Sequence, residues 1–454
     1  YDACIRRYRY QGKFEFTYVS TSQVIVKRLA SGQRIVLKSH FGYEVTRINI
    51  YQDRFLVAHT PETILMGDLE TCNLSEIAWM GSGQEKFYFD NPQLCMIFNA
   101  GELSLVEYGR NEILGSCRTE HMNSHYISVR IINEPAKPPA DDGFVQPEEG
   151  NKKIAYLIDM QTVRILDLVT GITLATVNHD VNIDWLELNE TSSFLLFRDK
   201  KRQLHLYNIE DQTRSTLLNY CSYVQWVPDS DVVVAQNRTN LCVWYSIEHP
   251  ERTYIIQIKG DVEDIERNEH GRTVVVVDEG INSVSYALDQ SLIDFGSAMK
   301  HSDYDRAMAC LENLELTPET EAMWGTLAAA CVKDQPPNLM IAERCYAALG
   351  DISKTRYLHK VNTIAEYARG EIGGDGTQHF MVRAKMAVLQ HDFKVAENIL
   401  VDQGQIDECL DMYQELHKWD EAIFVAEAKN HENAADLRSN YYTWLIDTGQ
   451  EGQA

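Results

Sequence analysis

The sequence predicts a seven-bladed β-propeller over residues 1–290, followed by an α-solenoid over residues 291–454. Short apolar runs, typical of strands, recur with a period near 40 residues through the first part of the chain. After Leu288 the apolar period changes from 2 to 3.6, which indicates helices to the end of the sequence. The single long gap between repeats coincides with residues 133–152, a segment rich in proline and acidic residues.

The repeat is clearest between Lys153 and Ile247. Comparable runs begin at Val163, Leu204 and Leu241, 41 and 37 residues apart, a spacing that fits four strands per propeller blade. The corresponding third strand can be found seven times, at Val24–Leu29, Ile64–Leu69, Leu103–Tyr108, Val163–Leu168, Leu204–Ile209, Leu241–Ile247 and Val284–Leu288.

Two irregularities interrupt the repeat. Proline removes strand hydrogen-bond donors, so residues 133–152 are expected to form an exposed loop inserted in the fourth blade. A fourth strand is predicted in six blades, but after Leu288 the chain turns directly into a helix. The last blade is therefore expected to be three-stranded, or to be closed by residues upstream of Tyr1, where the chain starts without methionine like a piece of a longer protein.

The repeats resemble degenerate WD40 repeats. The Trp-Asp pair that ends the third strand of such repeats is reduced to Gly-Asp at 67–68 and Leu-Asp at 166–167. His40 and His179 precede predicted first strands, where WD repeats carry Gly-His. We interpret both histidines as hydrogen-bonded structural residues rather than ligands.

The helical part shows pairs in which an aromatic residue is followed three positions later by alanine. A small residue there lets the next helix approach closely, which is typical of tetratricopeptide (TPR)-like hairpins. The pairs are Tyr304/Ala307, Phe393/Ala396 and Trp419/Ala422. The expected helices include one over Ser291–Leu314 and one opening at Pro318, followed by Leu339–Leu349, Asp351–Arg369, Phe380–Leu389, Phe393–Val401, Ile406–Leu416, Asp420–Ala428 and Asn433–Ile446.

Composition excludes several functional classes. The net charge is −25 and both parts are acidic, which disfavours nucleic acid as a partner. No apolar run is long enough for a transmembrane helix. The ten cysteines lack metal-ligand spacing and are expected to be buried free thiols in a reducing compartment.

The sequence predicts no catalytic, cofactor or metal site. Asp294-Phe295-Gly296 matches a kinase motif, but the phosphate loop and the catalytic loop that kinase chemistry needs are missing. We expect this tripeptide to lie in the first helix of the solenoid. The chain is therefore predicted not to be an enzyme.

Two charged segments are candidate protein contacts. One is a basic run in a predicted strand-to-strand turn, made of Arg198, Lys200, Lys201 and Arg202. The other is the acidic helical region 402–421, where Glu408 and Asp411 would face a basic partner surface. Either segment could instead be a solvated surface with no partner.

Segments spread from residue 14 to residue 429 resemble one family, the largest subunits of intraflagellar transport complex B. They include FEFTYVSTSQVIVK, LLFRDKKRQLHLYNIE, CSYVQWVPDSDVVVAQNRTNLCVWYSIE and DMYQELHKWDEAIFVAEAK. The resemblance implies the second of two propellers and the start of a helical array, in a non-catalytic scaffold that carries cargo along the axoneme for cilium assembly and maintenance.

The resemblance also implies partners and a location. The partners would be other complex B subunits and, through them, kinesin and dynein motors; peripheral membrane contact is compatible with this role. The location would be the ciliary axoneme, base and tip, and the cytoplasm. Two alternatives stay open: a vesicle-coat (coatomer-like) subunit, which shares the architecture, and a propeller hydrolase, which would need polar groups converging in the central channel.

Overall fold

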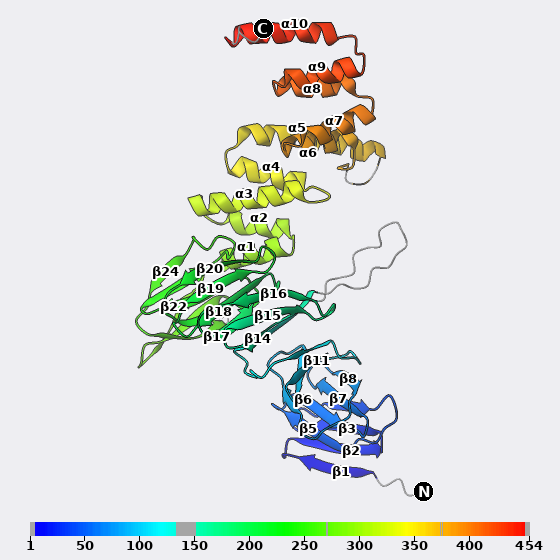
Figure 1. Ribbon diagram of the computed structural model, residues 1–454, viewed down its shortest axis with the longest axis vertical. Helices are drawn as coiled ribbons and strands as arrows, with labels where there is room; N and C mark the ends of the chain where they lie inside the picture. The colour runs from blue at the N-terminus through cyan, green and yellow to red at the C-terminus, as the bar shows by residue number, and fades with distance from the viewer. Residues whose placement is uncertain (1–4, 133–150, 269–270, 373, 375, 450–454) are drawn as a thin grey trace. The chain divides into compact units, whose positions relative to one another are not determined.

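The computed structural model describes residues 5–132, 151–268, 271–372, 374 and 376–449 (Figure 1). The chain divides into two compact units, Tyr1–Leu288 and Asp289–Ala454. The first unit is built of strands and the second of helices. No helix among the described residues is long and apolar enough to cross a membrane.

The described part of the first unit forms seven antiparallel sheets, each made of strands consecutive in the chain. The first three sheets contain β1 (Arg6–Tyr10), β2 (Phe14–Ser20), β3 (Gln23–Arg28) and β4 (Arg34–Lys38); β5 (Arg47–Tyr51), β6 (Phe55–His59), β7 (Thr63–Asp68) and β8 (Asn73–Ala78); β9 (Lys86–Tyr88), β10 (Leu94–Asn99), β11 (Glu102–Glu107) and β12 (Gly115–Arg118).

The next four sheets contain β13 (Ile127–Ile132), β14 (Asn151–Asp159), β15 (Thr162–Asp167) and β16 (Thr173–Asn178); β17 (Ile183–Leu188), β18 (Phe194–Asp199), β19 (Leu204–Asn208) and β20 (Thr213–Leu218); β21 (Cys221–Trp226), β22 (Val233–Asn237), β23 (Asn240–Trp244) and β24 (Tyr254–Gln257); β25 (Asp261–Arg267), β26 (Thr273–Asp278) and β27 (Ser283–Ala287). The last sheet has three strands, as expected from the sequence.

The predicted insertion is shorter than expected at its C-terminal end. Residues 133–150 lie outside the described residues, but Asn151 and Lys152 already belong to β14 and pair with Ile132 and Ile131 of β13. Lys152 is buried against the preceding sheet, and this contact fixes the start of the strand earlier than the apolar pattern suggested.

Local turn chemistry explains where strands reverse. Ala100 and Gly101 both have positive φ, 52° and 84°, in the two-residue turn between β10 and β11, a conformation that matches the strand twist. Gly67 of β7 is required for a different reason. A Cβ atom there would lie 2.2 Å from Leu74 Cδ2 and 2.7 Å from the carbonyl oxygen of Asn73, so only glycine allows β8 to approach.

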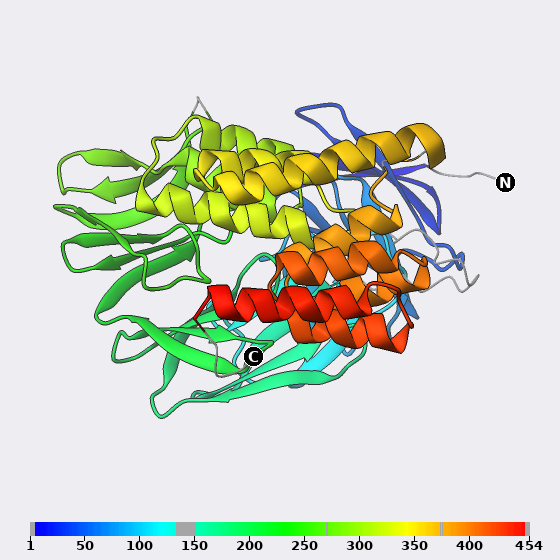
Figure 2. The same ribbon diagram turned by 90° about the horizontal axis from the view of Figure 1, so that it is seen from above.

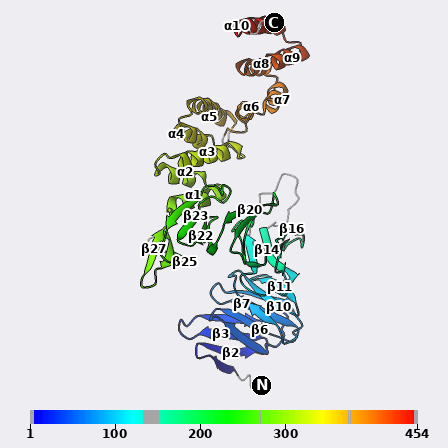
Figure 3. The ribbon, with the colours of Figure 1, turned by 60° about the vertical axis from the view of Figure 1, so that its left-hand side comes forward.

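Neighbouring sheets bury their faces against one another. Phe14 and Val24 of the first sheet share an apolar cluster with Ile50 and Leu56 of the second. Figure 3 shows β2, β3, β6 and β7 in these two adjacent sheets. The same arrangement continues further along the unit, up to the cluster that joins the fifth and sixth sheets around Trp244.

The described helices of the second unit are α1 (Gln290–Lys300), α2 (Tyr304–Glu312), α3 (Pro318–Lys333), α4 (Leu339–Ala348), α5 (Ile352–Ile372), α6 (Phe380–Leu389), α7 (Phe393–Asp402), α8 (Ile406–Glu415), α9 (Trp419–Ala428) and α10 (Ala434–Asp447). Consecutive helices pack side by side, as Figures 1 and 2 show for α3 and α4. The kinase-like tripeptide lies within α1, as predicted.

The prediction of one helix over Ser291–Leu314 was wrong. The helix breaks after α1, where Ser302 adopts a left-handed φ of 54°. The Asp303 side chain then accepts a hydrogen bond from the Arg306 N–H and caps the start of α2. The cap satisfies an N–H that would otherwise have no partner, so the chain forms a tight hairpin instead of a continuous helix.

The predicted aromatic–alanine pairs pack as expected. Ala307, Ala396 and Ala422 are each 0% exposed. Tyr304 and Phe393 pack, partly buried, against the two apolar clusters of the unit. Trp419 instead contacts the rings of Tyr441 and Trp444 on α10.

The expectation of buried thiols holds for most of the described cysteines. Seven are buried: Cys95, Cys117, Cys221, Cys242, Cys331, Cys345 and Cys409. Cys310 is half-buried, and Cys72 is exposed because it lies in the turn between β7 and β8, with a φ of 60°.

Candidate functional site

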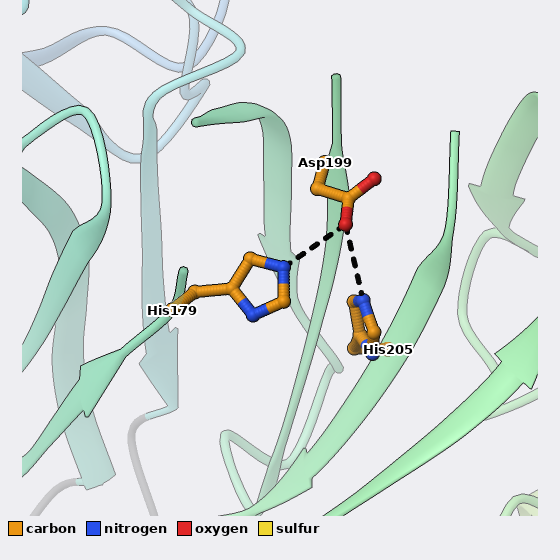
Figure 4. A group of neighbouring side chains, drawn as sticks. All are labelled: His179, Asp199 and His205. Carbon is orange, nitrogen blue, oxygen red and sulfur yellow. Dashed lines mark hydrogen bonds and ion pairs between the residues drawn. The ribbon is translucent and has the colours of Figure 1, made fainter. Parts of the chain in front are cut away.

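A buried cluster of three side chains joins the fourth and fifth sheets (Figure 4). His179 follows β16, Asp199 ends β18, and His205 lies in β19. His179 Nε2 is 3.0 Å from Asp199 Oδ2, and His205 Nε2 is 3.5 Å from the same oxygen. Only His179 was singled out from the sequence; the other two residues become neighbours only when β18 and β19 pair.

Hydrogen bonds identify the tautomer of His179. Arg214 Nη1 lies 3.1 Å from His179 Nδ1, and a guanidinium can only donate, so Nδ1 accepts. Nε2 therefore carries the proton and donates to Asp199. The interpretation of His179 as a hydrogen-bonded structural residue is confirmed.

Burial and hydrogen bonding shift the pKa values of the other two groups. Burial pushes the pKa of Asp199 upward, but hydrogen bonds from His179, from the Gln203 N–H and from His205 outweigh it, so the pKa is below its ordinary value. Burial lowers the pKa of His205, and the nearby His179 lowers it further. His205 Nδ1 lies 3.1 Å from Thr216 Oγ1, and its Nε2 faces Asp199 Oδ2 at 3.5 Å, a long contact for a hydrogen bond.

The cluster does not fit a resident metal ion, although its ligand atoms lie within 4.8 Å of one another. A histidine that binds a metal through one ring nitrogen donates from the other nitrogen to an acceptor. The second nitrogen of His179 instead faces the Arg214 donor. The three side chains therefore act as a structural link between two sheets, and Phe197 packs against both imidazole rings.

His40 plays a different part from the one expected. Its backbone N–H donates to Glu76 Oε2 at 2.6 Å, but its side chain is exposed and makes no hydrogen bond within the described chain. The preceding residue supplies the buried link, because Ser39 Oγ donates to Glu76 Oε1 at 2.7 Å. The expectation of a hydrogen-bonded His40 side chain was therefore wrong, and Ser39 has that role.

The basic run divides into two parts. Arg198 belongs to β18 and is bonded within the fold, through Nε to Asp184 Oδ1 (2.8 Å) and through Nη1 to the Ser222 carbonyl (3.0 Å). Lys200, Lys201 and Arg202 are exposed in the turn between β18 and β19. These three residues are available to a partner, whereas Arg198 is already engaged.

The acidic residues singled out in the helical unit lie on one exposed surface of α8. Glu408 and Asp411 are three positions apart, so they share a helix face, and both are exposed. Neither has an ion pair within the described part of the chain. Asp407 differs, because its Oδ1 is paired with His431 Nε2 at 3.1 Å.

A cavity of about 520 Å³ lies between the fifth sheet and the loop after β23. Phe194, Leu206 and Ile247 contribute apolar lining, and Glu210, Asp211 and Glu248 contribute its charge. The described residues that line it include hydroxyls and carboxylates but no histidine, lysine or cysteine. The cavity thus lacks the nucleophile–base pair that a hydrolase of the serine–histidine kind needs.

Comparison with known proteins finds similarity to intraflagellar transport proteins, both in a family model and in complete sequences. Residues 323–442 match the family model described as the IFT80/172/WDR35/WDR19 TPR domain. Over its whole length the chain is 58% identical to intraflagellar transport protein 172 of Chlamydomonas reinhardtii, and 55% identical to the homologues from Danio rerio and Homo sapiens. The chain spans 25% of the length of each of these curated relatives.

Proposed function

We propose that the chain is part of an intraflagellar transport protein of the 172 type, the largest subunit of complex B, and that it acts as a non-catalytic scaffold. The observation that carries this proposal is identity of 55–58% along the whole chain to proteins of that name. The match of residues 323–442 to a TPR domain of the same group of proteins supports it independently in the helical unit.

The proposed architecture is a closed seven-bladed WD-type propeller over residues 1–290 and a TPR-like solenoid over residues 291–454. Seven consecutive antiparallel sheets support the blade count. Shared apolar clusters between consecutive sheets support packing of blade on blade. The division into two compact units at Leu288 supports the proposed boundary.

In this proposal the chain carries cargo along the axoneme by binding other proteins. Its partners are other complex B subunits and, indirectly, kinesin and dynein motors. Its places of action are the axoneme, the ciliary base and tip, and the cytoplasm. Large assemblies gain affinity from many contacts acting together, so each isolated surface is expected to bind weakly. None of these relatives supports the alternative of a vesicle-coat subunit.

A pull-down from ciliated-cell extract tests the proposal. The tagged 454-residue chain is expected to recover intraflagellar transport subunits in preference to coat proteins. A matched control is Ala342→Arg, which places a charge at a fully buried position of α4 and disrupts the helical unit. Recovery of coat GTPases instead of transport subunits, or equal recovery by the control, would contradict the proposal.

A further inference from the structure

We propose that the strand-rich unit binds an acidic polypeptide segment along a ridge of basic side chains formed by neighbouring turns. The basic ridge consists of Lys200, Lys201, Arg202, Tyr220, Arg238 and Lys259. It extends the basic run found in the sequence with residues 18 to 57 positions farther along the chain. This inference concerns binding by the chain itself and does not depend on the proposed role in transport.

Backbone and side-chain contacts join these residues into one surface. The Cys221 N–H donates to the Arg202 carbonyl at 2.7 Å, which places Tyr220 beside the β18–β19 turn. The Arg238 guanidinium lies 4.5 Å from the centroid of the Tyr220 ring. Gln236 Nε2 then bridges the carbonyls of Arg238 (2.8 Å) and Gly260 (2.9 Å), which places Lys259 at the far end.

The β18–β19 turn, which carries Lys200, Lys201 and Arg202, is fixed by a backbone hydrogen bond to Asp199. The Arg202 N–H donates to the Asp199 carbonyl at 2.8 Å, and Asp199 belongs to the buried cluster of Figure 4. Arg202 adopts a left-handed φ of 62°, a conformation that needs such support. The side chains are therefore presented by an ordered backbone, so less conformational entropy is lost when a partner binds.

The charge of the ridge is not neutralised within the fold. All five cations are exposed, and none has an ion pair in the part of the chain that the structure describes. The carboxylate of Asp261, two residues after Lys259, already accepts a hydrogen bond from Gln236 Nε2 at 3.1 Å. In a chain with net charge −25, five clustered cations make a local positive potential that attracts acidic ligands.

The side chains favour a protein ligand over a membrane. Membrane surfaces bind through exposed apolar area as well as charge. Tyr220 is the exposed large hydrophobic residue of the ridge, 58% exposed, and a guanidinium covers its ring. Tyrosine and arginine together are typical of energetic hot spots in protein interfaces. A segment rich in aspartate and glutamate would pair with the cations while an apolar side chain contacts the tyrosine.

Fluorescence anisotropy of the 454-residue chain with a labelled twelve-residue polyglutamate probe tests the proposal. The double variant Lys200→Glu/Lys201→Glu is expected to weaken binding by at least tenfold. The matched control is Arg34→Glu/Lys38→Glu, which makes the same charge change at exposed positions of β4, and it is expected to change affinity less than twofold. Affinity should also fall steeply with added salt.

Two further measurements separate a binding effect from a folding effect and from lipid binding. Carbodiimide cross-linking of the probe to the unmodified chain should give products at Lys200, Lys201 or Lys259, and this arm does not depend on how the variants fold. Vesicles with 20% phosphatidylserine serve as the lipid comparison. Equal weakening by both double variants, cross-links elsewhere on the chain, or binding to vesicles but not to the probe would overturn the proposal.

Discussion

Lys152 Nζ lies 2.8 Å from Glu107 Oε2, and the two side chains are only 3% and 9% exposed. The pair joins β14 of the fourth sheet to β11 of the third, and Arg110 Nε approaches the same carboxylate oxygen at 3.1 Å. Removing one member of a buried ion pair leaves a charge without its partner, which is far more costly than replacing both. The contact thus links two sheets through groups that depend on each other.

We expect Lys152→Met to lower the free energy of unfolding of the strand-rich unit by about 3 kcal/mol, the lower end of the usual cost of breaking a buried pair, because Arg110 still pairs with Glu107. The double variant Lys152→Met/Glu107→Met should recover much of that loss, because no buried carboxylate remains. Urea unfolding of the wild type, both single variants and the double variant measures the coupling. Additive effects of the two single changes would show that the residues do not interact.

The cluster of His179, Asp199 and His205 should make stability fall with acidity. Because burial lowers the pKa of folded His205, the unfolded chain takes up a proton first as the pH falls. The free energy of unfolding should therefore decrease below pH of about 6.5, the ordinary value for histidine. Asp199, whose folded pKa is depressed, adds a further loss below pH of about 4.

Thermal unfolding of the chain between pH 7 and pH 5 measures this dependence. The variant His205→Asn should reduce the pH dependence, although His59, whose pKa burial also lowers, contributes to what remains. The control is His125→Asn, at an exposed position of the same unit. An unchanged pH dependence in His205→Asn would refute the assignment to this cluster.

The start of α3 should depend on a reciprocal pair of threonines. The Thr320 N–H donates to Thr317 Oγ1 at 3.3 Å, and the Thr317 N–H donates to Thr320 Oγ1 at 2.7 Å. We expect Thr317→Ala to destabilise the helical unit by about 1 kcal/mol, because a helix N–H loses its acceptor. Thr326→Ala, at an exposed interior position of the same helix, should be neutral or slightly stabilising in the same denaturation assay.

The exposed acidic face of α8 should contribute to partner binding. Glu408 and Asp411 have no ion pair among the described residues, so reversing their charge breaks no ion pair there. We expect Glu408→Lys/Asp411→Lys to reduce recovery of a basic partner in the pull-down by several-fold at low salt. The control Asp305→Lys/Glu366→Lys makes the same charge change on α2 and α5. Undiminished recovery at both low and high salt would identify the face as merely solvated.

The sequence predicted the elements that depend on local pattern. The strand starting at Leu204 and the buried alanines at 307, 396 and 422 follow from apolar period and residue size alone. The break at Ser302 was missed because the apolar spacing continues across it, from Ala298 to Ala307. A left-handed residue followed by a cap changes the chain direction without changing that spacing.

Contacts between distant residues could not be predicted in the same way. Asp199 and His205 meet His179 only through the pairing of β18 with β19 and the packing of the fourth sheet on the fifth. Tyr220 and Arg238 join the basic run across two sheets, and no spacing in the sequence indicates this. The charge of the basic run was visible in the sequence. The extent of the basic ridge, however, depends on which turns the fold places side by side.

The open edge of the last sheet gives the final prediction. Within the described residues β27 pairs with β26 alone, whereas β19, the equivalent third strand of the fifth sheet, lies between β18 and β20. An edge strand leaves alternate N–H groups without a strand partner, so water can exchange their hydrogens without unfolding of the sheet.

We expect hydrogen exchange of the 454-residue chain to find Ser283–Ala287 less protected than Leu204–Asn208, with at least half of the β27 amides exchanging rapidly. The burial of the two strands supports the same expectation, because β27 has no buried residue whereas four of the five residues of β19 are buried. Equal protection of the two strands would mean that another part of the chain covers this edge.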